Sequence, residues 1–176
     1  NVPGKNLIFT LVLSTMMIPS FATQIPQYVM FSKIGLSDTF WMWVLEALAG
    51  SSYLIFLCRQ YLLSMPSSLV EAAMIDGASQ AQIITKIVAP ISKPVLAICF
   101  FQIFNTSWGD YMLPYMYLSK EKYPLIVALM NSFEYVLPGT SVRLVPVVNA
   151  ATLLIAIPIF LVFFFCQKPL LQGATY

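Results

Sequence analysis

Residues 71–90 read EAAMIDGASQAQIITKIVAP and form a polar, glycine-broken interlude in a chain otherwise built from long apolar segments. Apolar side chains recur along the stretch at spacings that gather them into a ridge, and such a ridge must be buried against something. One interpretation is a plug that fits another protein, and the other is an amphipathic hairpin lying on a membrane surface. The ridge comprises Ile75, Ile83, Ile84, Ile87 and Val88.

Capping signals divide this stretch into two short helices. Ser68 followed three residues later by Glu71 matches a capping box, so we expect a helix to begin near Leu69. Gly77 can adopt the left-handed conformation that ends helices without a Cβ penalty, and it should stop the first helix. Residues 79–82, which begin with serine and end with glutamine, offer a second capping box and predict a second helix after a sharp turn.

The order and spacing of these residues resemble the EAA loop of permease subunits of binding-protein-dependent ABC importers. Ala89 departs from the family pattern, which commonly has leucine before the proline, and this weakens one apolar contact. The resemblance implies an all-α, polytopic transmembrane helical bundle of the type I ABC importer permease fold, whose loop forms a cytoplasmic coupling helix pair for a separate ATPase. The matching positions are Glu71, Ala72, Ala73, Gly77, Ile87 and Pro90.

The composition of the chain is that of an integral membrane protein. Hydrophobic residues make up 59% of the 176, charged residues 9%, and the mean hydropathy is +0.81; soluble domains carry roughly 25% charged residues. A bilayer core about 30 Å thick needs about 20 apolar residues in a helix, and lipid offers no other partner for the backbone groups. We therefore expect spans at 6–31, 40–63, 94–118 and 145–166, a cytoplasmic loop at 66–93 and an outer loop at 119–144.

Prolines and turn residues predict where these spans are irregular. Pro19 and Pro26 should kink or break the first span. Gly35 and Asp38 mark a turn in the link that follows it. The fourth span is expected to end at Lys168, next to a proline.

Several classes of function are disfavoured by what the sequence contains. A net charge of +2 without a basic run argues against nucleic acid. Cys58, Cys99 and Cys166 stand singly and the chain has no histidine, so we expect lipid-facing or core thiols and neither a metal site nor a catalytic Cys/His pair. Residues 4–6 lack the rest of a P-loop. We expect no catalytic residue and no cofactor, and ATP would have to bind another chain.

The resemblance extends beyond the loop, through residues 78–97, 107–111 and 123–125, to permeases of the carbohydrate-uptake, maltose-permease-like class. These usually have six spans, so we expect the chain to be a fragment without two N-terminal spans and the far C-terminus. The partners implied are a dimer of ABC ATPase subunits, a second homologous permease subunit, an extracytoplasmic solute-binding protein and a small polar solute such as a sugar. The location implied is the cell (inner) membrane, in the lipid bilayer.

Two carboxylates fall inside the expected spans, where a charge is costly and needs a reason. Glu46 and Asp110 are therefore expected to face protein or water. They could line the translocation path together with Asn105, Trp108 and Tyr111, which offer the amide and aromatic contacts that sugars accept. Alternatively, Asp110 braces helices and Glu46 reaches the membrane interface.

The outer loop also has a predicted element. Pro124 is followed by LIVALMNSFEY, which predicts a short helix with an apolar face. By resemblance it would dock at the open face of the pore and at the solute-binding protein, with Pro138 and Gly139 at the loop tip. The alternative is a helix that merely lies at the membrane interface.

The sequence thus predicts a permease subunit that forms part of a solute path and passes the motion of a separate ATPase to it. The alternative is an ATP-independent secondary transporter or channel that uses Glu46 and Asp110 as proton or cation sites. That alternative explains the carboxylates but not the capped hairpin.

Overall fold

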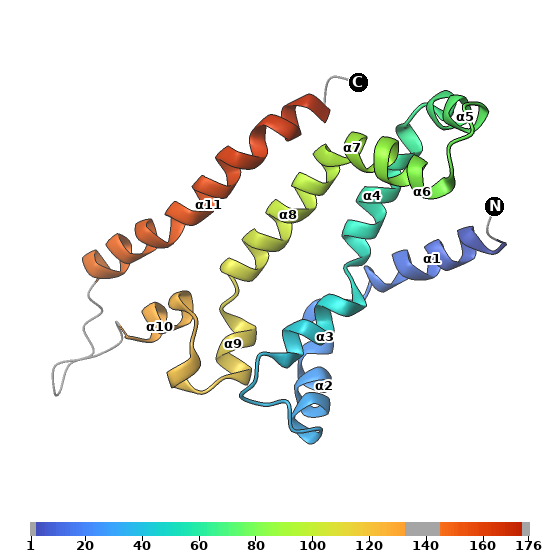
Figure 1. Cartoon of the computed structure of the whole chain (residues 1–176). Coiled ribbons are helices and arrows are strands. Elements are labelled where there is room, and N and C mark those ends of the chain that lie inside the picture. The colour runs from blue at the N-terminus through green and yellow to red at the C-terminus, as the bar shows by residue number, and fades with distance from the viewer. Residues whose placement is uncertain (1–2, 133–144, 174–176) are drawn as a thin grey trace, which may run out of the picture. The chain divides into compact units, whose positions relative to one another are not determined.

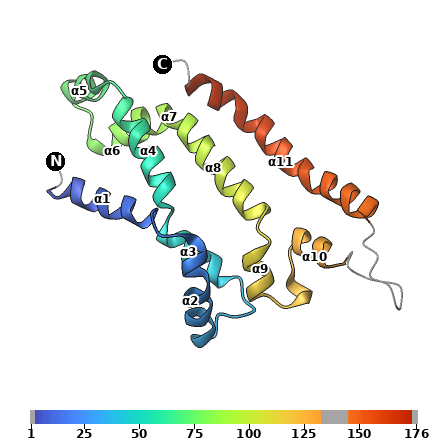
Figure 2. The same cartoon turned by 180° about the vertical axis from the view of Figure 1, so that it is seen from behind.

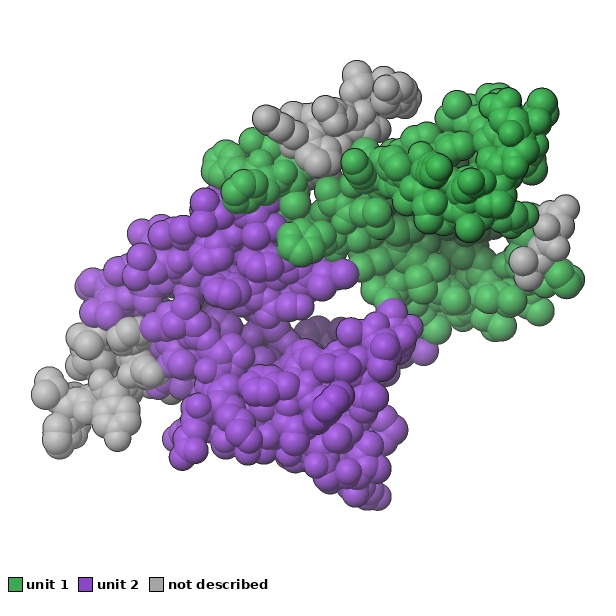
Figure 3. All heavy atoms as spheres, in the orientation of Figure 1, with its two compact units in different colours: residues 1–16, 51–102, 164–176 green, residues 17–50, 103–163 purple. Residues whose placement is uncertain are grey.

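The computed structural model describes residues 3–132 and 145–173, and its regular elements there are all helical. Two compact units emerge from the contacts within the chain (Figure 3). Unit 1 comprises residues 1–16, 51–102 and 164–176, and unit 2 comprises residues 17–50 and 103–163.

The helices follow one another in the order labelled in Figure 1. They are α1 (Lys5–Thr15), α2 (Ser20–Lys33), α3 (Trp41–Ala49), α4 (Ser52–Ser64), α5 (Ser67–Ile75), α6 (Gln80–Ile83), the π-helix η1 (Ile84–Val88), α7 (Ala89–Ile91), α8 (Lys93–Trp108), α9 (Met112–Tyr117), the 3₁₀ turn η2 (Lys120–Lys122), α10 (Leu125–Ser132) and α11 (Val145–Gly173).

By length and apolar composition, two helical stretches of the described residues could each cross a membrane. They are Trp41–Ser64 and Val145–Gln167, and the number rises to four if each of two bent helix pairs counts as one span. The bent pairs are α1 with α2, and Gln80–Ile91 with α8. The first span was expected to be kinked or broken, and the chain indeed breaks ahead of Pro19, whereas Pro26 lies inside α2 without interrupting it.

Two further breaks were not predicted. The second expected span is interrupted at Gly50, whose φ is 75°, and α4 restarts after Ser51, whose hydroxyl accepts a bond from the Leu54 N–H at 3.5 Å. The third expected span is interrupted between α8 and α9 at Gly109, where a Cβ would meet the carbonyl oxygen of Asn105 at 3.1 Å. A span average of hydropathy does not register single glycines, so the pattern missed both.

The fourth span was expected to end at Lys168; the stretch apolar enough to cross a membrane is Val145–Gln167, and helix α11 itself continues to Gly173. A proline disfavours the helical conformation mainly in the residue before it, and the helix passes Pro169 as it also passes Pro158. The predicted turn in the link between α2 and α3 is confirmed, since Gly35 (φ 76°) and Asp38 (φ 58°) are both left-handed.

Unit 2 is organised around an aromatic and thioether cluster. Phe31 of α2, Met42 of α3 and Tyr117 of α9 are buried together. The Tyr117 ring meets Tyr28 edge to face with ring centroids 5.1 Å apart, a favoured geometry for aromatic pairs. Helices far apart in the sequence thus share one small core within this unit.

Unit 1 joins α1 and α8 to α4. The Arg59 guanidinium of α4 lies 3.9 Å from the centroid of the Phe9 ring of α1, a cation–π contact. Cys58 and Cys99, expected to be lipid-facing or core thiols, are half-buried, and their Sγ atoms lie 3.5 Å apart between α4 and α8. Cys166 is buried, in agreement with a core thiol.

Candidate functional site

The polar stretch forms a hairpin of residues 67–91, with α5 as its first arm and Gln80–Ile91 as its second. Figures 1 and 2, seen from opposite sides, both show α5, α6 and α7 gathered at one end of α4. The first arm begins earlier than predicted, at Ser67. The capping box expected at Ser68 and Glu71 was wrong, because Pro66 is the N-cap and the Leu69 N–H closes the first turn on its carbonyl at 3.3 Å.

The predicted stop at Gly77 is confirmed. Gly77 has a φ of 78°, and its N–H donates to the Met74 carbonyl at 3.1 Å. The Ala78 N–H donates to the Ala73 carbonyl at 3.0 Å, which completes a Schellman motif. The bend of the hairpin is therefore fixed by backbone hydrogen bonds that require a left-handed residue at position 77.

The second capping box is confirmed as well. The Ser79 hydroxyl accepts from the Gln82 N–H at 3.3 Å, and the Gln82 side chain accepts from the Ser79 N–H at 2.8 Å. The arm then widens into the π-helix η1, where the Ala89 N–H donates to the Ile84 carbonyl. Pro90 lacks the N–H that would complete an ordinary α-helical turn here, which favours the wider helix.

The side chains of the hairpin divide into an inner and an outer set. Ala73 and Ile83 are buried, and Ile87 and Val88 are half-buried. The outer set includes two large apolar side chains that lie in the open, Ile75 at 86% exposure and Ile84 at 57%. Its other members at motif positions are Glu71, Ala72, Gly77 and Pro90, all exposed.

The candidate path residues adopt several different roles. The Trp108 indole N–H donates to the Ile155 carbonyl of α11 at 3.0 Å, and the Trp108 ring stacks on Phe104. Tyr111 is half-buried and stacks on Tyr115 with centroids 5.5 Å apart. Asn105 is exposed, and its side chain takes no part in these contacts.

The two carboxylates are brought together. Asp110 accepts from the Leu113 N–H at 3.2 Å at the start of α9, and the Trp43 side chain of α3 lies close to it. Glu46 of α3 is half-buried within electrostatic reach of Asp110. The Leu113 bond is local to the start of α9, and Trp43 of α3 is a neighbour of Asp110 that the sequence did not predict.

The Trp108 contact yields a prediction about stability. Trp108→Phe keeps a ring against Phe104 but removes the hydrogen-bond donor to Ile155. The free energy of unfolding should therefore fall by about 0.5–1.5 kcal/mol, the net value of one hydrogen bond. A lowered Tm of the purified protein would measure it. Trp41→Phe is the matched control, since Trp41 is 63% exposed, and equal melting of the two variants would contradict a stabilising role of the bond from Trp108 to Ile155.

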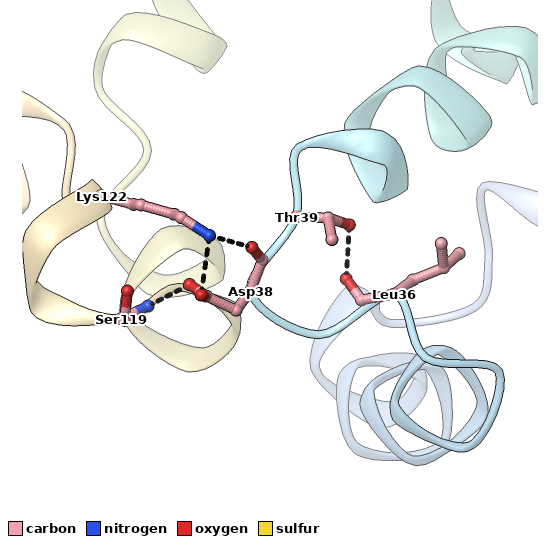
Figure 4. A network of polar contacts seen from close by, with 5 residues as sticks. All are labelled: Leu36, Asp38, Thr39, Ser119 and Lys122. Carbon is pink, nitrogen blue, oxygen red and sulfur yellow. Dashed lines mark hydrogen bonds and ion pairs between the residues drawn. The ribbon is translucent and has the colours of Figure 1, made fainter.

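An ion-pair network ties the link between α2 and α3 to the turn η2 within unit 2, as Figure 4 shows. The Lys122 ammonium donates to the carboxylate and to the carbonyl of Asp38, each at 2.7 Å, and the Ser119 N–H donates to the same carboxylate at 2.7 Å. The Asp38 N–H in turn donates to the Tyr117 carbonyl at 2.8 Å. Sequence patterns missed this network because Asp38 and Lys122 are 84 positions apart.

The network predicts how Asp38 titrates. Hydrogen bonding to Lys122 lowers the pKa of Asp38 from 3.8 to about 2, with further help from the Ser119 N–H. Because the pKa of Asp38 is lower in the folded state than in the unfolded state, the ionised carboxylate stabilises the folded state when the pH is above the ordinary pKa of 3.8. This stabilisation is present at neutral pH and is lost as the pH falls through about 2. ¹³C NMR of labelled aspartate should find this midpoint, and in Lys122→Met it should rise toward 3.8. An unchanged midpoint would remove the role of Lys122.

The model of the family described as "Binding-protein-dependent transport system inner membrane component" matches residues 1–173. The galactooligosaccharides transport system permease protein GanQ of Bacillus subtilis is 32% identical over 98% of this chain and 60% of its own length. The maltodextrin transport system permease protein MdxG of Bacillus subtilis is 32% identical over 97% of this chain and 60% of its own. The chain thus spans about 60% of the length of these curated relatives.

A solved structure has the same fold. It is the crystal structure of a bacterial ABC transporter involved in the import of the acidic polysaccharide alginate. The match has a TM-score of 0.77 at 28% identity and covers 96% of this chain and 62% of the other. The expected all-helical polytopic fold is confirmed by this likeness.

Proposed function

Because the chain belongs to the family of binding-protein-dependent transport system inner membrane components, we propose that it serves as a permease subunit of an ABC importer. In this proposal it forms part of a solute path in the inner membrane, and a separate ATPase subunit supplies the energy. The hairpin of residues 67–91 passes the motion of the ATPase to the membrane helices. The chain itself performs no bond chemistry.

The observation that carries the proposal is the construction of the hairpin. Its bend is rigid, because a Schellman motif and a capping box fix both sides of Gly77. Its outer surface nevertheless leaves Ile75 and Ile84 in the open. Burying each of these side chains against a partner would favour the complex by about 1.5–3 kcal/mol. A hairpin with a fixed bend and an exposed apolar surface is therefore suited to bind in a groove on a partner protein.

Coupling then follows from rigid-body motion. ATP binding closes a pair of ATPase subunits, whose grooves hold the hairpins of this subunit and of a second, homologous permease subunit. Closure moves the hairpins, and the attached helices tilt between inward-facing and outward-facing openings. An extracytoplasmic solute-binding protein delivers the solute to the outward-facing opening. In this arrangement α10, which follows Pro124 as predicted, lies on the outer side; Pro138 and Gly139 lie outside the described residues.

The solute class proposed is a sugar or oligosaccharide, on the strength of what the similar proteins are named for: galactooligosaccharides, maltodextrin and alginate. Glu46, Asn105 and Tyr111 remain the candidates for contact with the solute. Trp108 and Asp110 already have partners in α11 and α9, so we propose that they shape the path rather than bind the solute.

The test is transport by the assembled importer in proteoliposomes. Maltodextrin and galactooligosaccharide uptake should require ATP inside the vesicles and the binding protein outside. Accumulation driven by an ion gradient without ATP would instead favour the secondary transporter.

A further inference from the structure

The second arm of the hairpin meets α8 at a corner of 67°. Ser92 sits in this corner and is 7% exposed. Its N–H and its hydroxyl both donate to the Val88 carbonyl, at 2.9 and 2.7 Å, and its carbonyl accepts from the Leu96 N–H at 3.0 Å. These bonds hold the corner to its own flanking turns but do not reach α4.

The contact that does reach α4 is made by a tyrosine. Tyr61 lies in the last turn of α4, and its hydroxyl donates to the carbonyl of Ile91 at 2.8 Å, across 30 positions of sequence. Ile91 is the last residue of the arm. The bond therefore joins the end of one membrane helix to the corner from which the next one departs.

A second contact shows that α4 and α8 remain adjacent beyond the corner. Cys58, one turn before Tyr61, faces Cys99 of α8 with the Sγ atoms 3.5 Å apart. The contact between the two thiols imposes little directional constraint, whereas the hydrogen bond from Tyr61 is directional and its acceptor is a backbone carbonyl. Of these two contacts, Tyr61 is the one that can fix an angle.

We propose that Tyr61 is a positioning residue for coupling, an inference that rests on the proposed function. Its hydroxyl ties α4 to the exit of the hairpin, so a displacement of the hairpin carries α4 and α8 together. Without the hydroxyl, the bond from α4 to the carbonyl of Ile91 is lost, and the chain connections through residues 65–66 and Ser92 remain. The hairpin can then tilt without moving both helices. The solute-binding protein on the outer side would then stimulate ATP hydrolysis less.

The test compares Tyr61→Phe with Tyr53→Phe, a tyrosine on the same helix that is 46% exposed. The assembled importer in nanodiscs is assayed for ATP hydrolysis with and without the binding protein, and for the amount of ATPase subunit that co-purifies. We expect Tyr61→Phe to keep its ATPase subunits and its basal rate, while stimulation by the binding protein falls about three- to tenfold. That is the factor expected when one hydrogen bond is lost from the transmitting state.

Stimulation equal to that of Tyr53→Phe would overturn the inference. A proportional loss of basal rate, stimulation and co-purified ATPase would also overturn it, because that pattern indicates a merely structural role. If the wild-type importer showed no stimulation at all, the proposed function itself would fail, and this outcome is distinct from the other two.

Discussion

Gly77→Val should reduce coupled transport about five- to thirtyfold while leaving the subunit in the membrane. Gly77 has a φ of 78°, and a Cβ at this position would meet nothing within 4 Å. The penalty is therefore conformational and not a clash. A left-handed conformation costs an L-residue about 1–2 kcal/mol, and more with a β-branched side chain, which is about a five- to thirtyfold loss of the native bend.

Gly77→Asn is the matched control, since asparagine tolerates the left-handed region. Both variants should appear in the membrane fraction at wild-type amounts. Binding-protein-stimulated ATP hydrolysis should survive in Gly77→Asn and fall about five- to thirtyfold in Gly77→Val. Equal stimulation in the two variants would show that the bend of the hairpin does not carry coupling.

Glu71→Lys is expected to have an effect of similar size on docking. Glu71 lies exposed on the first arm of the hairpin, beside the small residue Ala72, which leaves room for close approach by a partner. Removing one member of a charge pair buried at an interface typically costs about 2–5 kcal/mol. Reversal of the charge should therefore weaken binding of the ATPase by ~30-fold or more.

The control for this variant is Glu121→Lys, another exposed glutamate, located in the turn η2 away from the hairpin sequence. Co-purification with tagged ATPase subunits should be lost for Glu71→Lys, intermediate for Glu71→Gln and unchanged for Glu121→Lys. Wild-type co-purification of Glu71→Lys would remove Glu71 from the docking surface.

Local signals in the sequence predicted the hairpin well. The stop at Gly77 and the capping box of Ser79 and Gln82 depend on residues within a few positions of each other, and the structure has both. The cap at Ser68 failed because Pro66, two residues upstream, starts the helix first. A single competing residue is enough to move a helix start.

Contacts between distant segments could not be predicted. The bond from Tyr61 to Ile91 spans 30 positions and the ion pair from Asp38 to Lys122 spans 84. No periodicity encodes such pairs, because they arise only when the helices pack. Family membership favours the ATP-driven importer over the ATP-independent alternative, which the carboxylates alone had left open.

Whether the hairpin docks into an ATPase subunit can be measured by site-specific photo-crosslinking. A benzophenone amino acid at Ile75, the exposed apolar residue before the bend, should capture the ATPase subunit in the assembled importer, and nucleotide should alter the yield. The same probe at Leu153 of α11, which is 72% exposed, should not capture it. Failure of probes at Ile75 and Ile84 to capture an ATPase subunit, with the importer intact, would contradict the account.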